Sequence, residues 1–257
     1  MATRPMLRVV EREVLVFARL WRGIVFSLFL SPLLYLAAMG VGLGGLVKAH
    51  TGNVGGVTYL QFVTPGMLVA VAMQVAAGES MWPVLGGVKW VQNYHAAVAT
   101  SIDADDVLYG TVLWIALRAM LGAVAFVAVA ALLGGIPSAW GILSIPVAGL
   151  CAAAFSAPLA AYSVMQDSDL VFAIIMRIGV LPIFLFSGTF FPISQLPHWL
   201  RPVAAISPLW HAVELARAAT TGHFRLGAAV VHVLVLVGCT AAGLVWGARR
   251  FERRLTS

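Results

Sequence analysis

A few ionisable side chains interrupt the long apolar stretches of this chain, and they are its best candidates for chemistry. Glu79, Arg118 and Arg177 each lie inside such a stretch, where a charge is costly and marks either pairing or contact with a transported solute. Both roles stay open for all three. Helical rise of about 1.5 Å per residue brings Glu79 and Arg118 to similar depths in successive stretches. We therefore expect an interhelical ion pair between them, while Arg177 has no evident partner.

Trp210, His211, Glu214 and Arg217 form a second group, in a proline-rich connection. His211 and Glu214 are three residues apart, a spacing that could hold a metal ion, but the sequence offers no third ligand. Glu214 and Arg217 have the spacing of an ion pair along one helix face. We expect the ion pair and no metal site.

Motifs for catalysis and for nucleotide binding do not occur in the sequence. It contains no GxxxxGK[ST] phosphate loop and no GxSxG, HExxH or CxxC motif, so nothing specifies ATP hydrolysis or chemistry on a substrate. We expect a protein that is not an enzyme and binds no cofactor.

The composition indicates a membrane protein. Of 257 residues, 61% are apolar and 10% are charged, whereas soluble domains have roughly 45–50% apolar and about 25% charged residues. One bilayer span takes about 20 apolar residues, so the chain has room for six spans and little else. We expect an all-α bundle rather than a barrel, because the apolar runs do not alternate with polar residues. The predicted spans are 24–46, 59–82, 107–134, 140–164, 170–190 and 226–248.

Both ends of the chain carry clusters of arginine. Residues 1–22 pattern as an amphipathic helix lying in the membrane interface, with a solvated helix as the alternative. Residues 249–257 form a short basic tail. An even number of spans places both termini on one side, and the positive-inside bias makes that side cytoplasmic.

Two connections are long enough to have structure. In 83–106, Trp90, Tyr94 and Val98 recur at four-residue spacing, which predicts a short amphipathic helix that either docks a cytoplasmic partner or anchors in the interface. The 191–222 segment predicts two short helices that dip into the outer leaflet and return. Its second helix should start at Ser207 and stop at Gly222.

Four stretches resemble the ABC-2 family of exporter permeases, and within it the NodJ-like nodulation-protein branch and the daunorubicin-resistance permeases. They are YLQFVTPGMLVAVAMQVAAGES (Tyr59–Ser80), VKWVQNYHAAVAT (Val88–Thr100), FLFSGTFFPISQLPHWLRPVA (Phe184–Ala204) and SPLWHAVELAR (Ser207–Arg217). The resemblance implies a type V exporter fold, with a connecting helix, a six-span domain over 24–248 and a re-entrant outer hairpin. It also implies a second permease subunit and two copies of a separate ATP-binding subunit, which would hold the ATP and Mg²⁺.

The resemblance further assigns roles to individual residues. The coupling helix to the ATPase would be Val88–Thr100, with contacts from Lys89, Trp90, Tyr94, His95 and Thr100. The acidic turn Ser101–Asp106 departs from the family's pattern, which leaves open the ATPase surface that it fits. Ordinary packing is the alternative for the residues expected to line the path, which are Met67, Phe184, Phe190 and Phe191.

The implied function is export of a lipid-linked glycan, a lipo-oligosaccharide or an amphipathic drug across the bacterial cytoplasmic membrane, with lipids and no nucleic acid as other partners. An ATP-independent channel or secondary transporter is the alternative. It would need embedded acids for ion coupling, and only Glu79 is a candidate. A membrane-embedded enzyme would need a nucleophile or an acid–base cluster.

Overall fold

The computed structural model describes residues 5–38, 42 and 56–256, and these residues fold into helices joined by short connections. Apolar runs of this length form helices in a bilayer because a helix satisfies its own backbone hydrogen bonds. The long helices are α1 (Pro5–Leu36), α3 (Tyr59–Lys89), α5 (Ala104–Leu132), α6 (Ser144–Ser163) and α11 (Leu226–Leu255). The shorter elements are α4 (Asn93–Val98), η2 (Ala139–Leu143), α7 (Leu170–Ile174), η3 (Ile175–Val180), α8 (Leu181–Phe186), η4 (Ile193–Gln195), α9 (Arg201–Ile206) and α10 (Pro208–Thr221).

Four helices in the described part of the chain are long and apolar enough to cross a membrane: α3, α5, η2 with α6, and α11. The predicted fifth span, 170–190, is a 17-residue run of α7, η3 and α8 that ends at Phe186, so its predicted boundary was four residues too late. The predicted first span, 24–46, continues α1 as a helix to residue 38, and most of its remainder lies outside the described residues.

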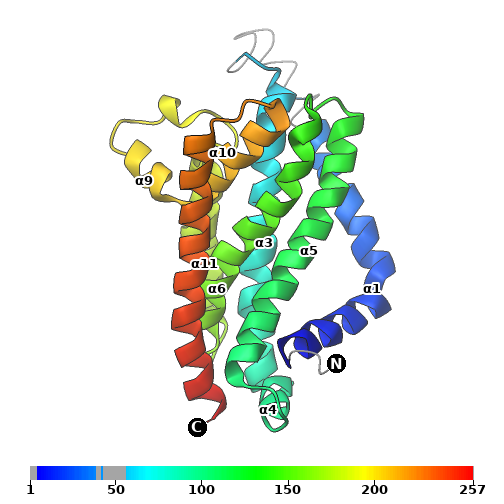
Figure 1. Ribbon diagram of the computed structural model, residues 1–257, viewed down its shortest axis with the longest axis vertical. Helices are drawn as coiled ribbons and strands as arrows, with labels where there is room; N and C mark the ends of the chain where they lie inside the picture. Colours follow the sequence, from blue (N-terminus) through cyan, green and yellow to red (C-terminus); the bar gives the residue numbers. More distant parts are fainter. Residues whose placement is uncertain (1–4, 39–41, 43–55, 257) are drawn as a thin grey trace.

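Helix α1 changes direction along its length. Its first part lies across one end of the bundle and its second part rises beside the other helices (Figure 1), as an interfacial helix leading into a span would. Val9 packs on Gly110 of α5, where an added β-carbon would lie 2.6 Å from Val9 Cβ. Leu7 and Val14 of α1 are exposed, whereas Val9 and Val10 are buried.

Small residues let the central helices approach one another closely. Helix α6 packs against α3, α5 and α11, and α10 packs against α3, α6 and α11. A β-carbon at Gly243 of α11 would lie 2.6 Å from Pro158 of α6. Backbones this close are typical of membrane helices, whose association depends on van der Waals packing.

The two ends of the bundle differ in content. The start of α1, the end of α11 and α4 lie at one end, called here the α4 end, and α9 and α10 lie at the opposite one, called the α10 end (Figure 1). The start of α1 and the end of α11 therefore share one end, as an even number of spans requires.

Candidate functional site

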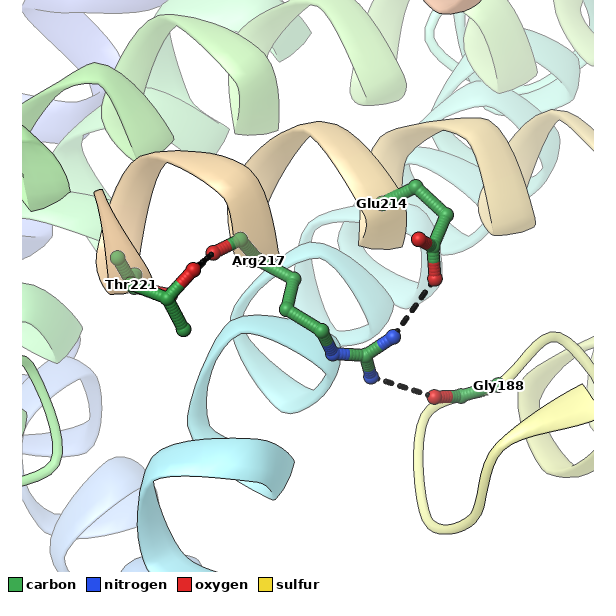
Figure 2. A network of polar contacts seen from close by, with 5 residues as sticks. Gly188, Glu214, Arg217 and Thr221 are labelled. Atoms are coloured by element: carbon green, nitrogen blue, oxygen red, sulfur yellow. Dashed lines mark hydrogen bonds and ion pairs between the residues drawn. The ribbon is translucent and has the colours of Figure 1, made fainter. Parts of the chain in front are cut away.

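Arg217 is the centre of a polar network at the α10 end (Figure 2). Its Nη1 lies 2.7 Å from Glu214 Oε1, so the expected ion pair within α10 is present. Its Nη2 donates to the carbonyl of Gly188 at 2.8 Å, in the turn after α8. The guanidinium also stacks over the ring of Phe62, 4.1 Å from the centroid. One side chain therefore joins α10, this turn and α3.

The turn Ser187–Thr189 is held by its own backbone conformation and by contacts with Ser207 and with α3. Gly188 has a φ of 80°, a left-handed conformation that favours glycine. Ser207 occupies the expected N-cap position of α10, but its hydroxyl makes no capping hydrogen bond to that helix. Instead, Ser207 Oγ lies 3.2 Å from Ser187 Oγ in the turn. Thr189 packs directly on Gly66 of α3. The FSGTFFP, SPLW and TPGM motifs thus meet at one place.

His211 pairs with a histidine that the sequence did not single out. Its Nδ1 lies 2.7 Å from Nδ1 of His232 in α11, and the ring of Trp210 packs at 4.8 and 5.2 Å from the two imidazole rings. Burial, followed by the nearby His232, lowers the pKa of His211. Within residues 5–38, 42 and 56–256 no three His, Cys, Asp or Glu side chains gather to hold a metal ion.

The residues expected along a translocation path lie in different environments. Met67 is buried in the core of the bundle. Phe184 and Phe190 meet edge to face with centroids 5.1 Å apart, although Phe190 and Phe191 lie beyond the end of α8. Arg177 is exposed in η3. Their contact with a transported molecule stays a prediction.

Glu79 of α3 and Arg118 of α5 form the expected interhelical ion pair, with Arg118 Nη1 2.6 Å from Glu79 Oε1. Each side chain keeps 27% of its surface exposed. Glu79 lines a cavity near α4 that is described below, and Arg118 pairs with Glu79 from outside that lining, so the pair lies in the part of the bundle nearest α4.

The expected helix over Val88–Thr100 is wrong in extent. Helix α3 continues to Lys89, the chain reverses, and α4 covers only Asn93–Val98. Gln92 breaks the helix because its φ is 54°, a conformation that ordinary residues rarely adopt. Trp90 therefore precedes α4 and is 61% exposed, while Tyr94 is 7% exposed, so the two do not share a face.

Tyr94 anchors α4 in the bundle and does not point outward as a docking residue would. Its ring lies against Gly87 of α3, where a β-carbon would be 2.9 Å from the ring. Its hydroxyl is 3.4 Å from Thr111 Oγ1 of α5, and its ring centroid is 6.2 Å from that of Phe251 in α11. Burial raises the pKa of Tyr94 to about 12, so the hydroxyl stays neutral at physiological pH.

The other residues predicted to contact an ATPase lie before, within and after α4. Lys89 donates to the carbonyl of Asp167, and the carboxylate of Asp167 pairs with Arg254 of α11 at 2.6 Å. His95 is half-buried and Thr100 is exposed. Lys89 therefore ties the turn after α6 to the α4 end, a role that the sequence did not suggest.

A cavity of about 340 Å³ lies between α1, α3, α4 and α5 at the α4 end, and we call it the inner cavity. It brings Glu79, expected in an ion pair or on the transport path, together with Trp90 and Tyr94, which were expected to contact the ATPase. The other lining residues are Arg12, Glu13, Trp82, Pro83, Gly86, Gly87, Val91, Asn93, Thr111, Trp114 and Ile115.

The fold and these sites define a multi-pass, all-α membrane protein whose long helices pack closely and whose connections are tied to the bundle at both ends. A sequence model of the family described as "ABC-2 type transporter" matches residues 6–221. This chain therefore belongs to the ABC-2 type transporter family.

Curated relatives support the assignment. The chain is 30% identical over 193 residues to a nodulation protein J of Rhizobium leguminosarum bv. trifolii, covering 75% of this chain and 72% of that protein. It is 27% identical to nodulation protein J of Rhizobium meliloti (strain 1021), covering 85% and 81%. The protein is accordingly a multi-pass bacterial membrane transport component, and its family implies partnership with an ABC ATP-binding subunit.

Proposed function

We propose that this chain is the permease subunit of an ATP-driven exporter that moves a lipid-linked glycan, a lipo-oligosaccharide or an amphipathic drug out of the cell. It would pair with a second permease and with two copies of an ATP-binding subunit. ATP and Mg²⁺ would be bound by that partner, and hydrolysis would occur there.

The carrying observation is the way in which α4 joins the bundle. Tyr94 touches α3, α5 and α11 at once, while Trp90 and Val91, at the same chain reversal, are 61% and 69% exposed. A large exposed apolar surface next to a rigid anchor suits a partner that pushes or pulls on the connection. Movement imposed there would reach three helices, as coupling through a two-state bundle requires.

The proposal places the α4 end in the cytoplasm and the α10 end outside. Arginines cluster in the first part of α1 and at the end of α11, and both of these segments lie at the α4 end. Positive charge favours the cytoplasmic side. In this orientation the turn Ser187–Thr189 and the adjacent Phe190 and Phe191 would form an outer valve.

Reconstitution tests the proposal. We expect ATP-dependent export in liposomes only when the neighbouring ATP-binding subunit is present, and photocrosslinking from position 90 to that subunit. Trp140 provides a matched control because it is 60% exposed at the opposite end, and a crosslinker there should not reach the ATPase. Transport without the ATPase subunit would instead support an ATP-independent channel or secondary transporter.

A further inference from the structure

The inner cavity combines aromatic walls with acidic groups from two helices. Trp82 of α3 and Trp114 of α5 line it together with Trp90 and Tyr94. The faces of aromatic rings attract ammonium groups, and the attraction is stronger when water is excluded. The walls of this cavity therefore suit an organic ammonium group.

Glu13 of α1 and Glu79 of α3 both line the cavity. Their carboxylates therefore belong to the same cavity but come from two different helices. Each also has an arginine partner, since Arg12 pairs with Glu13 and Arg118 pairs with Glu79. An ammonium group between the two carboxylates would reduce their repulsion, because it is attracted to both of them.

Arg12 supplies a positive charge at the rim and is held in place there. When the Asn93 amide is oriented with its oxygen toward Arg12, that oxygen accepts from both terminal guanidinium nitrogens at 3.0 and 3.1 Å, and the amide nitrogen donates to the Gly87 carbonyl at 3.2 Å. Arg12 keeps 48% of its side-chain surface exposed. A phosphate near the rim would find a fixed guanidinium, which binds phosphate oxygens well.

The size and place of the cavity favour a headgroup over a whole lipid. Its volume of about 340 Å³ is near the low end of ligand pockets, which run from about 300 to 1,000 Å³. Arg12 and Glu13 in the first part of α1 form one side of the cavity. This part of α1 is an amphipathic segment of the kind that lies at the depth of lipid headgroups. Acyl chains would remain outside, along the exposed apolar residues of α1.

We propose that the inner cavity binds the headgroup of a zwitterionic phospholipid, with its ammonium group between Glu13 and Glu79 inside the tryptophan walls and its phosphate beside Arg12. Glu13 and Glu79 are balanced by Arg12 in the lining and by Arg118, which pairs with Glu79 from outside it. The site therefore has no net charge, which matches a zwitterion better than an anionic lipid. A lipid held there would join α1 to α3, α4 and α5.

The test compares two lipids that share their acyl chains and phosphate, one with an ammonium-bearing ethanolamine headgroup and the other with an uncharged glycerol in its place. The purified full chain in detergent is titrated with dioctanoyl phosphatidylethanolamine and with dioctanoyl phosphatidylglycerol, and bound lipid is counted by native mass spectrometry. We expect saturable binding of the ethanolamine lipid with at least a tenfold preference. Glu13→Gln and Trp114→Phe should reduce that preference at least threefold. Neither residue belongs to the buried core, so neither substitution leaves a cavity there.

Two control variants keep the result interpretable. Glu252→Gln removes a carboxylate at the same end of the bundle, outside the inner cavity, and Trp140→Phe alters an exposed tryptophan at the opposite end. Both should bind lipid as the unmodified chain does. Equal binding of the two lipids, or a preference that survives both cavity substitutions, would overturn the proposal. The measurement involves no ATPase and no transport, so that outcome would leave the exporter proposal untouched.

Discussion

Thr189 lies so close to Gly66 that a β-carbon at position 66 would be 2.8 Å from Thr189 Cα and 2.9 Å from its carbonyl oxygen. This contact joins the turn after α8 to the most buried span, α3, and backbone atoms cannot move aside as the end of a flexible side chain can. The fit at the α10 end therefore depends on the absence of a single methyl group.

Gly66→Ala should destabilise the protein for this reason. Overpacking costs about 1–3 kcal/mol, against a gain of up to about 1 kcal/mol in helix propensity. Gly78→Ala in the same helix has open space around its new methyl group and should be neutral or stabilising. Thermal unfolding in detergent would compare the two variants, and equal melting temperatures would contradict the close contact.

Arg217→Lys should weaken the connection between α10 and the turn after α8. A lysine ammonium lacks the fork that lets arginine reach the Glu214 carboxylate and the Gly188 carbonyl together. We expect a loss of about 1–3 kcal/mol in the free energy of unfolding. The exposed Arg225 serves as the control, and Arg225→Lys should change the unfolding free energy little. A similar response from both variants would argue against the network.

Charge exchange tests the ion pair between α3 and α5. Glu79→Arg and Arg118→Glu should each destabilise the bundle, because each places like charges together. The double variant should recover part of the loss, with a coupling of about 1–3 kcal/mol. Chemical unfolding of all four proteins completes the cycle. A double variant no better than the worse single one would mean that the contact contributes nothing.

Tyr94→Ala should separate ATP hydrolysis from transport. The change removes the ring that fills the space between Gly87, Thr111 and Phe251, at a cost of about 3–5 kcal/mol in stability. With the ATP-binding subunit present, we expect hydrolysis to continue while transport per ATP falls. Tyr94→Phe keeps the ring and loses only a 3.4 Å hydroxyl contact, so it should couple normally. Normal coupling of ATP hydrolysis to transport in Tyr94→Ala would mean that Tyr94 does not transmit movement from α4 to the bundle.

Acid should loosen the contact between α10 and α11. Burial, and then His232, lower the pKa of His211 in the folded protein. The neutral imidazole therefore stabilises the fold fully above about pH 6.5, the ordinary pKa of histidine, and this stabilisation is lost as the pH falls below that value. Glu214 faces the same pair and partly opposes this loss, and His223 and Arg225 lie at a small cavity beside His232.

Thermal unfolding between pH 8 and pH 5 would measure the effect. His211→Phe should flatten the pH dependence, whereas His198→Phe, at an exposed position on the same side, should leave it as in the unmodified chain. If His211→Phe leaves the pH dependence of thermal unfolding unchanged, the histidine pair is not the source of the sensitivity to acid.

Local patterns were sufficient for features that depend on neighbours in the chain. The ion pair of Glu214 with Arg217, the start of α10 at Pro208 and its end before Gly222 followed from spacing and residue type. The pair of Glu79 with Arg118 joins two helices, and it could be predicted because helical rise places the two residues at similar depths in successive spans.

Predictions that needed orientation or distant partners were less successful. The four-residue spacing of Trp90, Tyr94 and Val98 suggested one face, but the left-handed Gln92 separated Trp90 from α4. Nothing in the spacing of the last span singled out His232, and only the packing of α11 beside α10 brings it against His211.

The sequence by itself determined that this is a helical membrane protein with charged residues at a few depths, because hydropathy and helical period depend only on residue order. Only the tertiary structure decided that Tyr94 points inward, that Gly66 must lack a side chain, and that Glu13, Glu79 and three tryptophans surround one cavity. Those facts depend on the rotation and separation of helices, which are set by close packing between segments far apart in the chain.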